Sequence, residues 1–588
     1  MRYLRMLTNS LVAGALGAAF VGILVLQLNP GLPLTADVVA PLYLKLLALY
    51  GTHLAVAFYT LIVVRQLFSR EILSPGWLSL RLLAWLSAAI AGTASILMWV
   101  NLSDLRLVLE REATRRMAAG SAATGVCAAL LLIIAIVNYS FGRRGSRTAV
   151  ALFAATVACA VALPVAARGW GRPASRAGRP AMPPPMLTPA PAAARVVLVL
   201  LDGASLEYIA PATAEGRLPN LGRVLDQGAS MHLTTIRPTQ PATVWAAVAT
   251  GKYPAANGVR SAATYGFGHR LHRLELLPDH VFSYALLRVG MLDAREHDAG
   301  ALRARPLWEI LSRQNIGVGV VGWPLSDPVR PVRGYIVSDR VHRVTHTLLP
   351  LEDPRLVYPA DAFTSASPPG VPGTILDGPG GDADAAASAP ETSTSIPAGR
   401  DLASRDEWYG RIVAALEERY QPQVAAVRFQ GIDAAGHHYL RYAMPRAFGD
   451  VSEEERRRHG LVLEREYARV DERVGAYLAT LGPDDVLLIV SGFGMEPVSV
   501  VKRLLARALG ERDLTGTHER GPDGFLLAYG GPVASGRLAL GAVVDVTPTI
   551  LYFLGLPVGR DMDGYARTDL FKRSFTAERP ITFIPSYE

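Results

Sequence analysis

The chain has 588 residues, roughly four times a typical domain of about 150, so more than one folding unit is expected. Hydrophobic residues make up 50% and charged residues only 19%, which excludes disorder of the whole chain and is unusual for a cytosolic enzyme. The net charge of +8 is spread along the sequence and mixed with acids. Because nucleic-acid binders concentrate their cations, no nucleic-acid partner is expected.

The N-terminal region, residues 1–167, contains long apolar stretches that predict an all-α bundle of about five transmembrane helices. They are Leu7–Leu28, Val38–Val64, Leu82–Val100, Met117–Val137 and Ala149–Ala167. Each is long enough to cross a hydrocarbon core of ~30 Å. Arginines gather near the N-terminus and at 65–81 and 143–147, whereas residues 29–37 carry no cation. The positive-inside rule therefore predicts a cytoplasmic N-terminus.

Five crossings place everything after residue 167 outside the cytoplasm. We therefore expect an integral protein of a bacterial-type inner or plasma membrane, with its soluble part extracytoplasmic or periplasmic. Lys45 and His53 lie inside the second apolar stretch, where ionisable groups are candidates for a function. Snorkelling or helix packing is the simpler interpretation, because no other stretch offers an acidic partner. Neither cysteine lies outside the apolar stretches, so no Cys-based metal site is expected in the soluble part.

Residues 168–194 are rich in Pro, Ala and Arg and predict an extended linker. Residues 195–588 form the soluble domain, in which the Pro-, Gly- and Ser-rich stretch 365–399 predicts a disordered insertion.

Apolar β-branched runs alternate with amphipathic patterns after residue 195, which predicts an α/β fold with a largely parallel sheet. The expected strands are Val196–Leu201, Val318–Trp323, Tyr335–Ser338, Val424–Phe429, Val486–Val490 and Phe525–Tyr529. The expected helices are Leu218–Leu225, Leu307–Arg313, Trp408–Arg419, Glu453–Leu481 and Thr547–Leu554.

Polar residues follow several of these strands, and ligands gather at the carboxyl ends of strands in such sheets. Asp433 and His437 follow one strand four residues apart, a spacing that can close on one divalent metal. His518, just before the strand at Phe525, offers a third ligand. An Asp–His–His set with an open position is typical of a catalytic zinc site. Asp202 ends another strand, although a carboxylate before Gly203 is also an ordinary turn.

Several ordered motifs resemble the type I phosphodiesterase and nucleotide pyrophosphatase branch of the alkaline phosphatase superfamily. They are Leu201-Asp202-Gly203, Ala249-Thr250-Gly251-Lys252-Tyr253-Pro254, Asp433-x-x-Gly436-His437, Val490-Ser491-x-x-Gly494-Met495, Thr517-His518 with Pro522-Asp523-Gly524, and Asp545-x-x-Pro548-Thr549. The resemblance implies a three-layer alkaline-phosphatase-like domain with a two-metal phosphoester site.

In this family, one metal would take Asp433, His437 and His518. The other would take Asp202, an Asp–His pair after the strand at Val486, and a Thr or Ser nucleophile. Two such cations, ~4 Å apart, activate the attacking oxygen and stabilise the leaving one.

The sequence departs from this pattern twice. Gly492 and Phe493 stand where the family has the Asp–His pair, and Pro241 stands at the nucleophile position. The hydroxyl candidates are then Thr239, which we favour, and Thr243, with a metal-activated water as the competing nucleophile. One zinc is therefore expected, while the second site retains only Asp202.

Two functions remain open. The first is a membrane-anchored, extracytoplasmic, metal-dependent phosphoric ester hydrolase or phosphotransferase acting on a phosphorylated small molecule, lipid or glycan. The second is a catalytically degenerate relative that binds a phosphorylated lipid or glycan without turnover. Residues that could contact an anionic substrate are Arg428, His438, His342 and His346.

Overall fold

The computed structural model of the chain describes residues 1–68, 75–141, 147–171, 194–269, 271–341, 355–362, 400–449, 451–500, 502–504 and 514–588. Its contacts divide the chain into two compact units. The first contains residues 1–178 and 263–296, and the second contains residues 179–262 and 297–588. Most of the predicted linker and all of the predicted insertion at 365–399 lie outside the described residues.

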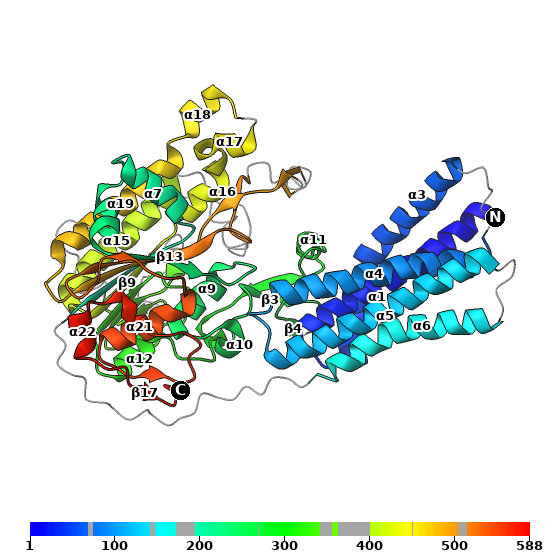
Figure 1. Cartoon of the computed structure of the whole chain (residues 1–588), viewed down its shortest axis with the longest axis horizontal. Helices are drawn as coiled ribbons and strands as arrows, with labels where there is room; N and C mark the ends of the chain where they lie inside the picture. The colour runs from blue at the N-terminus through cyan, green and yellow to red at the C-terminus, as the bar shows by residue number, and fades with distance from the viewer. Residues whose placement is uncertain are drawn as a thin grey trace. The chain divides into compact units, whose positions relative to one another are not determined.

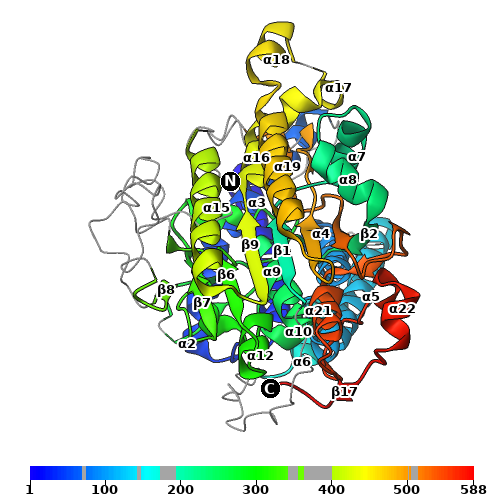
Figure 2. The same cartoon turned by 90° about the vertical axis from the view of Figure 1, so that its left-hand side faces the viewer.

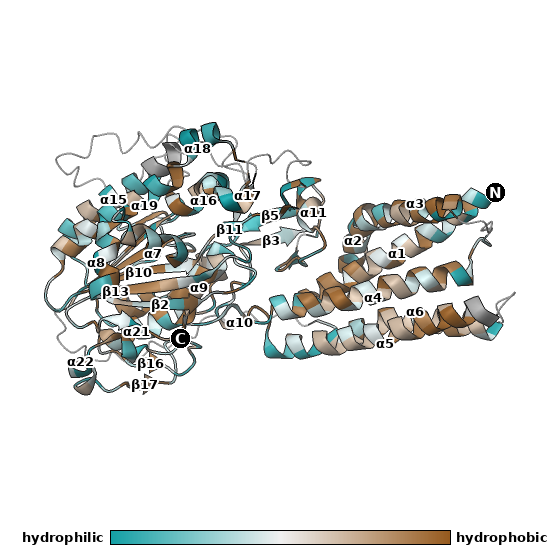
Figure 3. Cartoon of the chain, turned by 45° about the horizontal axis from the view of Figure 1, so that its top comes forward, coloured by the Kyte–Doolittle hydropathy of each residue, from teal (hydrophilic) through white to brown (hydrophobic). Residues whose placement is uncertain are grey.

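The first unit is built on long apolar helices (Figures 1 and 3). They are α1 (Arg2–Leu28), α2 (Ala36–Leu46), α3 (Thr52–Phe68), α4 (Leu80–Asp104), α5 (Arg111–Phe141) and α6 (Arg147–Arg168). A π-helical turn, η1 (Leu47–Gly51), joins α2 and α3 into one span. Within the described residues, five helices are thus long and apolar enough to cross a membrane, as predicted. Their orientation stays a prediction.

Residues 263–296 fold onto one end of these helices, although the sequence assigns them to the soluble domain. They form β3 (Ala263–Gly266), β4 (Arg273–Leu274), α11 (Tyr284–Arg288) and β5 (Asp293–Glu296), with the strands in the order β4-β3-β5. Phe267, Leu274 and Leu286 are buried in one apolar cluster with Leu26 of α1 and Leu42 of α2. Burial of apolar side chains at this junction therefore holds the segment to the helices.

Polar contacts reinforce this junction. The side chain of Asn29 accepts hydrogen bonds from the backbone N–H groups of Glu275 (2.7 Å) and Leu276 (2.9 Å). Lys45 donates from Nζ to the carbonyl of Met291 at 2.6 Å, which supports the packing interpretation of that residue. His53 instead contacts the carbonyl of Leu49 within its own helix, through Nδ1 at 2.6 Å.

The second unit contains a ten-stranded mixed sheet in the order β14-β2-β13-β10-β1-β9-β6-β7-β8, with β15 also pairing with β2. The strands are β1 (Val196–Leu201), β2 (Ala229–Thr234), β6 (Val318–Val321), β7 (Gly334–Val337), β8 (Val357–Tyr358), β9 (Val424–Phe429), β10 (Val486–Phe493), β13 (Asp523–Gly530), β14 (Gly536–Arg537) and β15 (Gly541–Ala542). The central strands β10, β1, β9, β6 and β7 are parallel. The predicted α/β class with a largely parallel sheet is confirmed.

Helices cover both faces of this sheet (Figure 2). One face packs against α7 (Leu206–Ala214), α8 (Pro219–Gln227), α15 (Arg400–Tyr420), α16 (Gly431–Ala443) and α19 (Val462–Thr480). The other packs against α9 (Pro241–Thr250), α12 (Leu307–Arg313) and α21 (Val546–Phe553). Both faces of the sheet are therefore apolar, which explains why the central strands consist of continuous hydrophobic residues.

The six predicted strands are confirmed with small shifts of their ends, but β2 was not predicted. It lies between β13 and the short strands β14 and β15 and alternates buried and half-buried residues, so it lacks the continuous apolar signal of the central strands. The predicted helix Glu453–Leu481 is divided into α18 (Glu453–His459) and α19, with Gly460 and Leu461 between them.

Candidate metal centre

The candidate metal ligands come from two elements at the carboxyl end of the central strands. Asp433 and His437 lie on the first two turns of α16, directly after β9, and their i, i+4 spacing puts them on the same helix face. His518 follows β12 (Gly516–Thr517), a short strand paired with β11 (Glu496–Pro497). The ligand atoms of these three residues all lie within 4.8 Å of one another.

The two imidazoles are held in a fixed orientation. Nδ1 of His437 donates to the carbonyl of Gly516 at 2.9 Å, and Nδ1 of His518 donates to the carbonyl of Thr239 at 3.0 Å. Each Nε2 is therefore left to face the centre of the group, as in zinc sites where a backbone carbonyl fixes the tautomer of a ligating histidine. The ring centroids of His437 and His518 are 5.1 Å apart.

The electrostatics favour a charged Asp433 carboxylate and a neutral His518 imidazole. Burial acts to raise the pKa of Asp433, but the neighbouring His437, His518 and Arg428 outweigh it and lower that pKa to about 2. Burial lowers the pKa of His518. The pKa of His437 is raised because the charge of Asp433 and their hydrogen bond outweigh the effect of burial.

The residues fit a divalent metal such as zinc. Oδ1 of Asp433 is buried and has no hydrogen-bond partner among the described residues, and its other oxygen lies 3.5 Å from Nε2 of His437. A buried carboxylate oxygen without a partner is costly unless a ligand satisfies it. Two imidazoles and one carboxylate form the three-ligand set of a catalytic zinc site. The side chains of His437 and Asp433 are 17% and 16% exposed, so the group is accessible from solvent.

Gly203 allows this carboxylate to approach the end of β1. It adopts a left-handed backbone conformation with φ +68°, and a Cβ at this position would lie 2.8 Å from Cα of Asp433. Any other residue would push the end of β1 away from the first turn of α16.

Asp202 lies outside the group of three ligands. Nε of Arg428, on β9, donates to both of its carboxylate oxygens at 3.0 Å, and Nη2 of Arg428 also donates to Oδ2. Nε1 of Trp245, on α9, donates to Oδ1 at 2.7 Å. The side chains of Asp202 and Arg428 are each only 2% exposed. The sequence predicts that Asp202 is a metal ligand. In the structure both of its carboxylate oxygens already bind Arg428, so its role as a ligand stays a prediction.

The two candidate hydroxyls are both buried. Thr239 lies two residues before α9, where its carbonyl accepts the hydrogen bond of His518 and its N–H donates to the carbonyl of Glu519 at 3.0 Å. Thr243 lies in the first turn of α9, which begins at Pro241. Neither Oγ has a hydrogen-bond partner within the described part of the chain. Their catalytic roles stay predictions.

Position 492 has no room for a ligand side chain. A Cβ on Gly492 would lie 2.5 Å from Cγ1 of Val244. Phe493 is fully buried, and its ring lies 5.0 Å from that of His518. Where the related pattern has an Asp–His pair, this chain therefore packs apolar groups.

The sequence reasoning missed a carboxylate that caps the ligand-bearing helix. Asp406, on α15, accepts hydrogen bonds from the backbone N–H groups of Gln430 (3.1 Å) and Gly431 (2.7 Å), at the N-terminus of α16. Burial raises its pKa, against the effect of Arg405 and these two N–H groups. No sequence signal pointed to it, because it comes from another helix 25 residues before Gly431.

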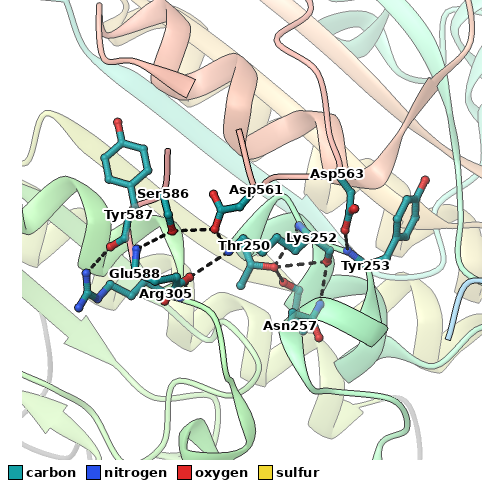
Figure 4. Close-up of polar contacts among 11 residues, drawn as sticks. Thr250, Lys252, Tyr253, Asn257, Arg305, Asp561, Asp563, Ser586, Tyr587 and Glu588 are labelled. Carbon is teal, nitrogen blue, oxygen red and sulfur yellow. Dashed lines mark hydrogen bonds and ion pairs between the residues drawn. The ribbon is translucent and has the colours of Figure 1, made fainter. Parts of the chain in front are cut away.

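Other motif residues have structural roles. Lys252 follows α9 and binds Asp561 (2.5 Å) and Glu588 (3.1 Å) through Nζ, which ties the C-terminal segment to the end of this helix (Figure 4). Asp545 accepts from the N–H groups of Ala542 and Tyr565 at 2.9 and 2.8 Å. His438 is half-buried on α16, and His342 and His346 lie outside the described residues.

Comparisons with known proteins identify a family for the chain. Residues 196–538 match the family model of type I phosphodiesterase / nucleotide pyrophosphatase. No curated protein matches the chain. Among solved structures, human ectonucleotide pyrophosphatase / phosphodiesterase 5 aligns at 13% identity and a TM-score of 0.36, covering 64% of this chain and 100% of that one. On the family match, the chain belongs to the type I phosphodiesterase / nucleotide pyrophosphatase family, a family of metal-dependent hydrolases in the alkaline phosphatase superfamily.

Proposed function

We propose that the chain is a membrane-anchored, extracytoplasmic phosphodiesterase that works with one zinc ion, held by Asp433, His437 and His518. The observation that carries this proposal is the geometry of these three ligands. They converge within 4.8 Å, and a backbone carbonyl orients each imidazole. A merely structural Asp–His–His cluster has no need for an unpartnered, buried carboxylate oxygen.

Zinc at this site would polarise a phosphoryl oxygen and stabilise the charge that develops during the displacement. The chain supplies the remaining groups. A hydroxyl oxygen, from Thr239 or from water, forms a bond to phosphorus while the bond from phosphorus to the leaving alkoxide breaks. The proton of the attacking hydroxyl passes to the leaving oxygen. When water attacks, this step completes hydrolysis. When Thr239 attacks, its oxygen stays bonded to phosphorus until a water attacks in a second step, breaks that bond and returns a proton to the Thr239 oxygen.

The charges of the site favour a diester over a monoester. A diester carries one negative charge and a monoester up to two. The paired charges of Asp202 and Arg428 cancel each other locally, so a single divalent ion faces the substrate. The five apolar helices support a substrate at or near a membrane, which for a phosphodiester means a lipid headgroup or a lipid-linked glycan.

Hydrolysis of bis(p-nitrophenyl) phosphate by the full-length protein in detergent tests this proposal, with p-nitrophenyl phosphate as the monoester comparison. We expect zinc-dependent hydrolysis of the diester that a chelator removes and zinc restores. His437→Ala should lower it by more than about 100-fold, because even changes behind a ligand typically cost 10–100-fold. His232→Ala, on strand β2 and outside the group of three ligands, is the matched control and should retain activity.

The degenerate alternative remains a second candidate because Gly492 and Phe493 remove the ligands of a second metal. Zinc-loaded protein that turns over neither ester, but binds phosphorylated lipid in vesicles, would favour that function over hydrolysis.

A further inference from the structure

Arg428 binds the carboxylate that, by the family resemblance, would hold a second metal ion. It belongs to β9, at the position that pairs with Leu200 of β1, and its side chain reaches the carboxylate at the end of β1. The family's second metal would use that same carboxylate, Asp202. In this chain the guanidinium engages it with hydrogen bonds to both oxygens, and Trp245 donates to one of them as well.

A second divalent ion does not fit beside this pair. A zinc site uses at least three protein ligands. Asp202 is fully engaged, Gly492 has no side chain, and Phe493 offers no ligand atom. A guanidinium keeps its charge at any pH that a protein tolerates, so it cannot give way to a metal by losing a proton.

Arg428 acts as the cation at Asp202, and the charges of the two groups cancel each other. Both side chains are buried, and the guanidinium donates to both carboxylate oxygens.

We propose that Arg428 is the resident cation of the second metal position, which makes the chain a one-metal member of its family. The guanidinium neutralises Asp202 permanently, and the site takes one divalent ion per chain. The role of Arg428 in catalysis rests on the proposed function. The number of bound metal ions and the stability of the Asp202–Arg428 pair can be measured without any turnover.

The first test counts metals in the full-length protein in detergent, after loading with zinc and removal of the excess. We expect one zinc per chain in the native protein, none in His437→Ala, and one in the double variant Asp202→Asn/Arg428→Met. Two zinc ions in the native protein would overturn the proposal. So would loss of zinc from the double variant, because Asp202 would then be a ligand.

The second test measures the melting temperature in metal-free buffer. Arg428→Met alone leaves the charge of Asp202 buried without its partner, so it should lower the melting temperature more than the double variant does. Arg195→Met, which breaks the half-buried pair with Glu417, is the matched control and should cause the smaller fall. A double variant no more stable than Arg428→Met overturns the pairing. If the native protein binds no zinc, the proposed function fails while this comparison still decides the role of Arg428.

Discussion

Thr239 connects the candidate metal ligand His518 to the start of α9. Its carbonyl holds His518 in place, whereas its hydroxyl is buried with no hydrogen-bond partner among the described residues. These two roles belong to different atoms. A side-chain substitution can therefore remove the hydroxyl while the backbone contact to the ligand remains.

We expect Thr239→Ala to lower phosphodiester turnover by about 100-fold or more, a typical contribution of a group that takes part in the reaction. Its melting temperature and zinc content should stay close to native, since a buried hydroxyl without a partner contributes little to stability. Thr239→Ser should restore turnover, and Thr243→Ala should retain it. Loss of turnover in His437→Ala but not in Thr239→Ala would identify water as the nucleophile.

The grouping of the three candidate metal ligands was predictable from sequence because their types and spacing carry the chemistry, while metal binding itself stays a prediction. Asp433 and His437 are four residues apart on one helix, and His518 completes the set. The partner of Asp202 was not predictable in the same way. Arg428 is one of many arginines in the sequence, and only the parallel pairing of β1 with β9 brings it to that carboxylate.

At the scale of elements, the position of α16 depends on Asp406. The first N–H groups of a helix have no partner within the helix, and here a carboxylate from α15 satisfies two of them. Asp433 follows within one turn, so fraying of this end would move a metal ligand.

We expect Asp406→Ala to weaken zinc binding by about 10–100-fold, the range seen when a group that orients a ligand is removed. It should also cost about 1 kcal/mol of unfolding free energy, as for loss of a helix cap. Ser452→Ala, which removes the cap of α18, is the matched control. It should cost similar stability but leave zinc affinity unchanged. Equal zinc affinity in the two variants, measured by competition with a chelating dye, would contradict a positioning role for Asp406.

At the scale of the molecule, the alternation of apolar runs and helices predicted the fold class and the central strands, because buried parallel strands carry a continuous signal. The attachment of residues 263–296 to the membrane helices was not predictable. It depends on contacts such as those of Asn29 with Glu275 and of Asn101 with Asp279, which join residues far apart in the chain. Single polar residues near helix ends carry no sequence signal for such partners.

These contacts bear on the topology. Asn29 follows α1 and Asn101 lies near the end of α4, and odd numbers of crossings put both on the side opposite the N-terminus. Residues 263–296 follow all five candidate spans, so the odd number of crossings puts them on that side too. Their contacts with Asn29 and Asn101 agree with this placement.

With the arginine-rich loops in the cytoplasm, this arrangement predicts an extracytoplasmic soluble domain. A reporter enzyme that is active only after export should therefore be active when fused after Glu588 and after Asp104. The same reporter fused after Phe68, at the end of the second span, should be inactive, which provides the internal control. A reporter that works only in the cytoplasm, such as one that must fold before export, should give the reverse pattern. Cytoplasmic activity of the Glu588 fusion would overturn the orientation, and with it the proposal that the substrate is an extracytoplasmic phosphodiester.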